Sequence, residues 1–278
     1  MKTVKLNSKN VTSKLMLFVC VAIMATGFNA CKKVPPIITG DYNAGEIPGL
    51  GNTEGELTGT PFRLPEGIEL TGNITGVDYS QRHKYNYWDL GDYVPARSFI
   101  NKRGEVEKEQ PPIQRTGEDV VINYFGSGEG YVDLLFPLRN VTSTPITITF
   151  PAATIMRSKA GDCQNAVLIK QVKVIIPANS DYLLCVVFYC GNLSKSSAYS
   201  DDIYELGVVS DAKPLLDLCE RVKNKKINIE EFSPTSMADY ETYSSQTYRL
   251  QSIVWEITDY SGLDDYDIEY INSLPNSQ

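Results

Sequence analysis

The sequence predicts a mainly β protein with C-terminal helices: an antiparallel β-sandwich, immunoglobulin-like or related, decorated by about three α-helices. Two patterns indicate this class. Between residues 119 and 190, short apolar runs of alternating character recur with polar or glycine-rich turns between them, as half-buried strands of a sandwich do. After residue 211, apolar residues recur at the longer period of amphipathic helices.

The strands follow from these runs. In residues 146–150, Ile146, Ile148 and Phe150 alternate with two threonines, so one face should be buried. Residues 182–190 are apolar on both faces, which predicts a central strand. Residues 120–125 and 131–136 flank the glycine-rich stretch 126–130, which predicts a hairpin.

Three helices are expected. The first runs from an Asp211 cap through residue 223, with Leu215, Leu218, Cys219 and Val222 on one stripe. The second spans residues 243–258, with Leu250, Ile253, Val254 and Ile257 directed inward. The third opens at a capping box in residues 261–264 and ends before Pro275.

The chain divides into four parts. Residues 1–30 form a signal peptide: four lysines precede an apolar run in residues 15–25 that is too short to span a bilayer, and Ala30 marks the cleavage point. Residues 31–65, rich in proline and glycine, are expected to be a flexible, lipid-anchored tether. Residues 66–115 form an irregular, aromatic-rich segment that packs on the core, and residues 116–278 form the sandwich with its helices.

The stretch Phe28-Asn29-Ala30-Cys31 resembles the lipobox of bacterial lipoproteins, in which a small residue precedes a cysteine. The resemblance implies a diacylglycerol on Cys31, cleavage before it and acylation of the new N-terminus, which together anchor a protein stably. Lys32 and Lys33 differ from the aspartate signal that retains lipoproteins in the inner membrane. We therefore expect anchoring in the outer membrane of a Gram-negative cell, on either its periplasmic or its outer side.

Charge and residue types exclude several function classes. The net charge is −8, and removal of the four lysines of the signal leaves about −12, which argues against nucleic acid as a partner. The single histidine, His83, provides too little material for a Cys/His zinc site or a serine triad. We expect no enzyme activity, no metal and no cofactor beyond the lipid; membrane contact should come from the lipid, and the partner should be a protein or a glycan.

Four cysteines remain after the signal and the anchor are set aside: Cys163, Cys185, Cys190 and Cys219. In an exported chain they form a pool for disulfides with three possible pairings. Cys185 and Cys190 lie five residues apart on one predicted strand, so their side chains should point to opposite faces.

A second resemblance concerns Leu250-Gln251-Ser252-Ile253-Val254, which is similar to the apolar-Gln-any-apolar-apolar motif of bacterial thioester-domain adhesins. Residues 119–275 also resemble exported β-sandwich modules. The adhesin resemblance implies an internal thioester between Gln251 and Cys190, which follows the aromatic Tyr189. The alternative is that Gln251 bonds the backbone while Cys190 is a buried thiol or part of a disulfide.

Aromatic residues gather between positions 79 and 93, and Tyr85, Tyr87, Trp88 and Tyr93 form a candidate contact surface for a glycan or a protein. The alternative is that these rings cover the core. The sequence as a whole predicts a lipid-anchored envelope lipoprotein acting as a non-catalytic interaction or adhesion module. The alternatives are a covalent thioester adhesin and a glycan-binding or glycan-processing accessory protein.

Overall fold

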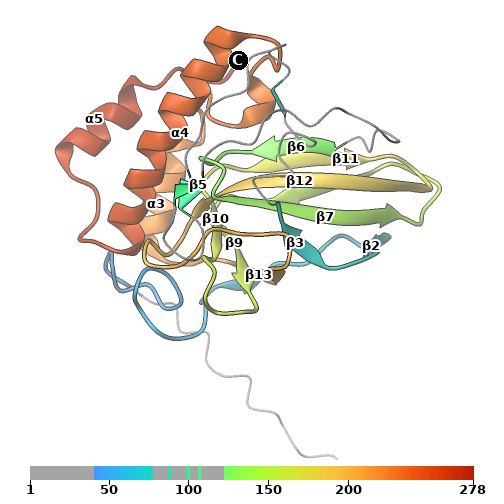
Figure 1. Ribbon diagram of the computed structural model, residues 1–278, viewed down its shortest axis with the longest axis horizontal. Coiled ribbons are helices and arrows are strands. Elements are labelled where there is room, and N and C mark those ends of the chain that lie inside the picture. Colours follow the sequence, from blue (N-terminus) through green and yellow to red (C-terminus); the bar gives the residue numbers. More distant parts are fainter. Residues whose placement is uncertain (1–40, 78–86, 89–98, 101–105, 108–121) are drawn as a thin grey trace, which may run out of the picture. The chain divides into compact units, whose positions relative to one another are not determined.

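The computed structural model describes residues 41–77, 87–88, 99–100, 106–107 and 122–278. It confirms a mainly β protein with three α-helices in its C-terminal part (Figure 1). Cys31 and the signal segment lie outside the described residues.

Six strands close into a ring. They are β7 (Val132–Asn140), β3 (Ile74–Gly76), β13 (Ile203–Val209), β9 (Thr154–Ser158), β10 (Ala166–Leu168) and β12 (Ser180–Cys190). Each is hydrogen-bonded to the next, and β12 pairs back with β7. The sheet is thus a closed barrel with extra strands and not a clear two-layer sandwich. Alternation within a strand tells which face is buried, but it does not choose the neighbouring strand.

Further strands extend this ring. β1 (Thr60–Pro61) pairs with β13, β2 (Ile68–Leu70) pairs with β7, and β6 (Ile122–Gly126) runs parallel to β12. β8 (Ile146–Phe150) and β11 (Val172–Ile176) form a separate antiparallel pair, and β4 (Phe99–Ile100) pairs with β5 (Val106–Glu107). The predicted β6–β7 hairpin is wrong, because both strands pair with β12.

The long strand β12 separates two apolar clusters. Leu184, Val186, Phe188 and Cys190 belong to the cluster that also holds the inward residues of β7, β8 and β11. Tyr189 belongs to the second cluster, which packs against the helices. The prediction of a central strand with two apolar faces is therefore confirmed, and the two faces serve different cores.

The helices cover one side of the sheet (Figure 1). α3 (Lys213–Val222) buries its predicted stripe of four residues, and α4 (Met237–Thr258) buries Leu250, Ile253, Val254 and Ile257 as expected. α4 begins earlier than predicted, because the Ser236 side chain accepts a hydrogen bond from the Asp239 N–H. α5 (Asp265–Ser273) is capped one turn later than predicted, by Asp264 with Asp267.

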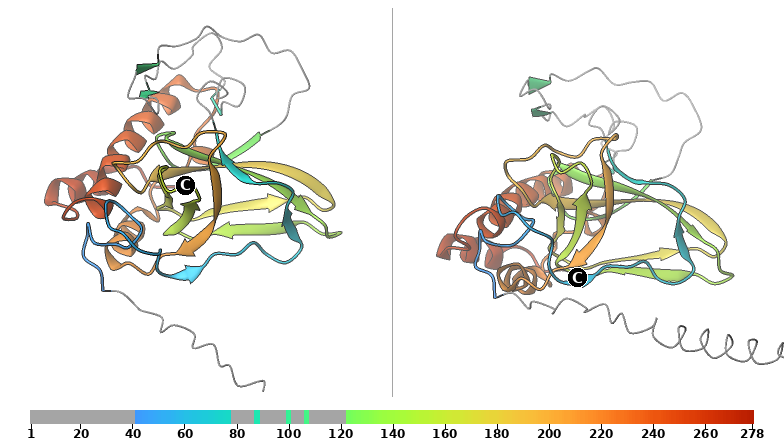
Figure 2. Two further views of the ribbon diagram at one scale, coloured as in Figure 1. Left: turned by 60° about the horizontal axis from the view of Figure 1, so that its bottom comes forward. Right: turned by 90° about the horizontal axis from the view of Figure 1, so that it is seen from below.

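The segment 41–65 was expected to be a flexible tether, and the structure differs. Ile47 and Leu50 are buried in the helix-side cluster, and Phe62 is buried in the other. The Gly45 N–H donates to the carbonyl of Ile257. Figure 2 shows this segment passing beside the helices. A few well-placed apolar residues suffice to dock a proline- and glycine-rich chain, although they show no regular period.

Candidate functional site

A polar cleft of about 390 Å³ lies where three separate parts of the chain meet. One wall is the loop 49–55. The second is formed by Arg157 and Ser158 at the end of β9 with Asn165 just before β10, and the third is the turn 192–195 that follows β12. The residues that line it are Gly49, Gly51, Asn52, Thr53, Glu54, Gly55, Arg157, Ser158, Asn165, Asn192, Ser194 and Lys195. Small-molecule sites commonly have volumes of about 300–1,000 Å³, so the cleft has the size of a ligand site.

Two buried asparagines hold the loop 49–55 against the sheet. Asn165 Nδ2 donates to the Gly49 carbonyl at 2.8 Å, and Asn192 Nδ2 donates to the Gly51 carbonyl at 2.9 Å. Asn192 Oδ1 in turn accepts from the Asn165 N–H at 2.9 Å. These amides act as a scaffold for the cleft, because their hydrogen bonds are made within the protein.

Glycine is required at position 51. Its φ is +56°, in the left-handed region, and an added Cβ would overlap the carbonyl oxygen of Thr258 at the end of α4. The Gly51 N–H donates to the Gly191 carbonyl at 2.7 Å. The absence of a side chain therefore lets the loop lie directly on the backbone of the helix.

The charged groups of the cleft differ in how far they are already paired. Arg157 bonds Glu56 at 2.5 Å and also forms an ion pair with Glu205. Glu54 and Lys195 make no side-chain hydrogen bond or ion pair within the described part of the chain. The Ser194 hydroxyl donates to Asn52 Oδ1 at 2.8 Å. Glu54 and Lys195 are therefore free to meet a ligand, whereas Arg157 is largely neutralised.

Two buried oxygen atoms near the cleft lack a hydrogen-bond partner among the described residues: Oγ of Ser158, a lining residue, and Oε1 of Gln164. Gln164 is linked to the cleft through Nε2, which donates to the Lys195 carbonyl at 3.1 Å. Unpartnered buried polar atoms are rare in folded proteins and call for a specific explanation.

This cleft was not predicted from the sequence. Its loop was assigned to the tether, and its other residues are polar side chains scattered over separate turns. The available signal was the spacing of Gly49, Gly51 and Gly55, which is also compatible with a linker.

The structure does bring Cys190 and Gln251 together. The Cys190 N–H donates to Gln251 Oε1 at 2.8 Å, and Gln251 Nε2 donates to the Cys190 carbonyl at 3.1 Å. The side chain of Cys190 belongs to the cluster inside the sheet. A thioester between them stays a prediction, and it would require the Gln251 amide to leave the backbone and turn to the sulfur.

The four remaining cysteines are all buried, and the structure places no disulfide among them. Cys185 and Cys190 lie on β12, and Cys219 lies on α3 in the helix-side cluster. Burial raises the pKa of the Cys219 thiol to about 12, so this thiol is poorly reactive.

Cys163 belongs to a group that could hold a metal ion. Its Sγ and carboxylate oxygens of Asp162 and Asp202 lie within 4.8 Å of one another. The thiol also donates to Asp162 Oδ1 at 3.6 Å, and Asp202 Oδ2 accepts from the Tyr199 N–H at 2.8 Å. The same atoms thus have roles inside the fold. No metal site was expected from the sequence, in which Asp202 was interpreted as an ordinary loop acid and Asp162 had no assigned role.

Of the four aromatic residues proposed as a contact surface, two are described. Trp88 is 9% exposed and packs edge-on against Tyr240 at a centroid distance of 5.4 Å. The Tyr87 hydroxyl donates to the Phe232 carbonyl. Trp88 therefore packs within the domain instead of presenting an exposed ring to a partner. Tyr85 and Tyr93 lie outside the described residues.

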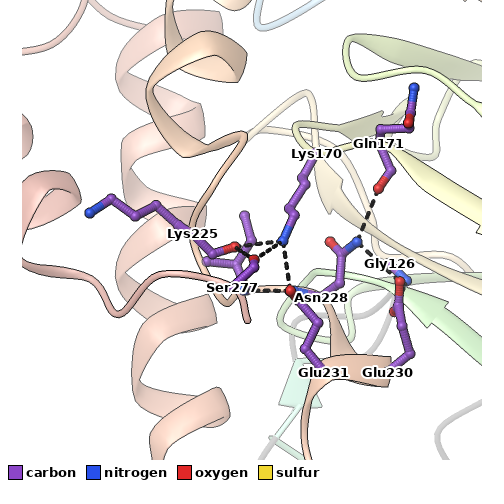
Figure 3. Close-up of polar contacts among 9 residues, drawn as sticks. Gly126, Lys170, Gln171, Lys225, Asn228, Glu230, Glu231 and Ser277 are labelled. Atoms are coloured by element: carbon purple, nitrogen blue, oxygen red, sulfur yellow. Dashed lines mark hydrogen bonds and ion pairs between the residues drawn. The ribbon is translucent and has the colours of Figure 1, made fainter.

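A buried ion pair ties the last residues to the sheet (Figure 3). Lys170, which follows β10, donates to both carboxylate oxygens of Glu231 at 2.9 and 2.8 Å, to the Lys225 carbonyl at 2.6 Å and to the Ser277 hydroxyl at 2.8 Å. The Ile227 and Asn228 N–H groups donate to Glu231 as well. With its donors occupied, Lys170 has a structural role.

The neighbouring Glu230 has a different environment. Its carboxylate accepts from the Gly126 N–H at 2.8 Å and from the Asn228 side chain at 3.1 Å. Glu230 is exposed at the surface. Desolvation of its carboxylate nevertheless raises its pKa to about 7, because this effect outweighs the lowering effect of the hydrogen bonds. For Glu231, hydrogen bonds from Lys170 and Ser277 outweigh desolvation and lower its pKa.

Comparison with known proteins adds no relative: no family model, curated protein or solved structure matches this chain.

Proposed function

We propose that the protein is a lipid-anchored cell-envelope protein that acts as a non-catalytic binding module, with the cleft at residues 49–55 and 192–195 as its ligand site. Lipidation at Cys31 and an outer-membrane location are parts of this proposal that rest on the sequence of residues 1–31. None of the helices in the described part of the chain combines the length and the apolar character that a membrane-spanning segment needs.

The observation that carries the proposal is the construction of the cleft. Two buried asparagines, Asn165 and Asn192, are used to hold an irregular loop at a fixed position. Within the described part of the chain, the exposed side chain of Glu54 and the side chain of Lys195 beside this loop take part in no ion pair. Rigid scaffold residues that position open polar groups on a loop are the arrangement that specific binding requires.

A photo-crosslinking experiment tests the proposal. A photoreactive amino acid placed at position 194, which is exposed in the turn that lines the cleft, should capture a protein or glycan of the envelope in living cells. The same group at Asn73, exposed in the β2–β3 turn, is the matched control. Equal capture at both positions, or none at position 194, would contradict the proposed site.

Membrane attachment needs its own test. Cys31→Ala should release the protein from the membrane fraction and abolish its labelling by a radioactive fatty acid. Cys185→Ala leaves the anchor cysteine in place and should retain both. Membrane attachment and labelling that persist in Cys31→Ala would contradict the lipid anchor.

A further inference from the structure

We infer that the cleft binds an uncharged saccharide through its hydroxyl and amide groups. This inference rests on the proposed function, since it names the ligand class for the same site.

The charge of the cleft disfavours strongly charged ligands. The two charges that have no ion-pair partner among the described residues, the carboxylate of Glu54 and the ammonium of Lys195, have opposite signs, and Arg157 is occupied by Glu56 and Glu205. An anion attracted by Lys195 would be repelled by the carboxylate of Glu54. A cation attracted by Glu54 would be repelled by the ammonium of Lys195. A neutral ligand satisfies both groups when it donates hydrogen bonds to one and accepts them from the other.

The remaining groups also suit hydroxyls, which both donate and accept. Asn52 and Ser194 are exposed lining residues that bond each other through Asn52 Oδ1, which leaves the Asn52 NH₂ group to donate outward. The loop contributes backbone without a side chain at Gly55, whereas the backbone groups of Gly49 are already bonded within the protein. Oγ of the lining residue Ser158 is buried beside these groups and lacks a hydrogen-bond partner among the described residues.

Among the described residues, no aromatic side chain lines the cleft, and the side chains that line it are polar or charged. Binding therefore lacks the stacking that tight sugar sites use and depends on hydrogen bonds, each of which contributes modestly against water. We expect a dissociation constant on the order of 1 mM for a short oligosaccharide. Avidity on a polymeric glycan would raise the effective affinity.

Three short oligosaccharide probes, of three or four sugar units, test the ligand class on the full mature chain in detergent. They are the neutral trimer of N-acetylglucosamine, its deacetylated cationic form and an anionic hyaluronan tetrasaccharide. Amide chemical shifts should move at residues 49–55, 157–158 and 192–195 with the neutral trimer, and several-fold higher concentrations of the charged probes should be needed.

Variants distinguish binding in the cleft from adventitious contact. Glu54→Ala and Ser194→Ala should each weaken binding of the neutral trimer by about 3- to 10-fold, the effect of one lost hydrogen bond. Glu69→Ala on β2 and Ser245→Ala on α4 alter exposed residues elsewhere and should leave binding unchanged.

The outcomes separate this inference from the proposed function. Preferred binding of a charged probe, or no shift with the neutral trimer, overturns the saccharide inference, and specific crosslinking at position 194 would then still support a binding module for another ligand. An equal effect of the cleft and control variants also overturns it. Failure of the crosslink itself would count against the proposed function.

Discussion

The Gln251 side chain forms a two-point hydrogen bond with the backbone of Cys190, donating through Nε2 at 3.1 Å and accepting through Oε1 at 2.8 Å. Gln251 is 1% exposed. Its amide thus provides, from a helix, the donor and acceptor that a neighbouring strand would offer to the end of β12.

Gln251→Met should destabilise the protein, because both backbone groups of Cys190 would lose their partner while the side-chain volume is retained. The cost of one buried unsatisfied group is about 1–3 kcal/mol. Urea unfolding measures the change. Ser252→Ala, one residue further along α4 and only partly buried, is the control and should change stability little. Equal stability of wild type and Gln251→Met would contradict the structural role.

The intact mass of the mature chain should equal that of its sequence plus lipid, with no loss of ammonia, because the Gln251 amide is bonded to backbone. Mass spectrometry under non-nucleophilic conditions measures this. The opposite result would be an ammonia loss that disappears in both Cys190→Ala and Gln251→Ala, which would establish the thioester.

Lys170→Met should destabilise the fold by about 3 kcal/mol, since Glu231 would keep a largely buried charge without its cation. The side chain of Lys170 is 10% exposed, and that of Glu231 is 22% exposed. Lys213→Met, which breaks the exposed pair with Asp217, serves as the control and should cost at most about 0.5 kcal/mol. In Lys170→Met/Glu231→Leu, removal of both charges should restore part of the lost stability, as measured by urea unfolding.

Glu230 and Glu231 should tilt the pH dependence of stability in opposite directions. The pKa of Glu230 rises on folding from 4.5 to about 7, so the folded state holds the proton more tightly and the free energy of unfolding falls as pH rises across this window. Glu231 has a lowered pKa, so its contribution is present above the unfolded pKa and is lost as pH falls through the folded value.

As the pH rises from about 5 to about 7, between the unfolded and folded pKa values of Glu230, the free energy of unfolding should therefore fall less in Glu230→Gln than in wild type. Glu231→Gln should instead make the free energy of unfolding fall less steeply as the pH is lowered into the acid range. Urea unfolding at a series of pH values measures both. Parallel curves for wild type and Glu230→Gln would refute the assignment.

Gly51→Ala should detach the loop 49–55, because its Cβ would overlap the Thr258 carbonyl at a left-handed φ. Gly161→Ala is a matched control: its φ is +75°, and nothing lies within 4 Å of an added Cβ. The control should cost only the backbone strain, about 1 kcal/mol. Thermal unfolding of both variants tests this, and similar costs would show that the contact with α4 is not required.

Much of the local structure follows from sequence periodicity. The stripe Leu215, Leu218, Cys219 and Val222 is buried as expected, as is the inward face of residues 250–257. The alternation in residues 146–150 places Ile148 and Phe150 in the core. These predictions succeed because the period of apolar residues reports the face that leaves water.

The meeting of Cys190 and Gln251 could be predicted from the sequence, whereas the candidate cleft could not. The motif around Gln251 and the aromatic Tyr189 before Cys190 indicated that the two residues meet, and they do. Their contact is to backbone, because Cys190 faces the interior of the sheet and Gln251 approaches the end of β12 from α4. Trp88 was chosen as a contact residue because it lies in an aromatic-rich stretch of the sequence. Its burial depends on α4, which lies next to it in the folded chain.

The sequence by itself determined the mainly β class, the three C-terminal helices and the faces that most of them bury. The tertiary structure decided which strands are neighbours, the closure of β12 onto β7 and the docking of residues 41–65. Periodicity is a local property, whereas the closure of β12 onto β7 and the fit of Gly51 against Thr258 depend on groups that are far apart in the chain. The cleft therefore exists only in the folded chain.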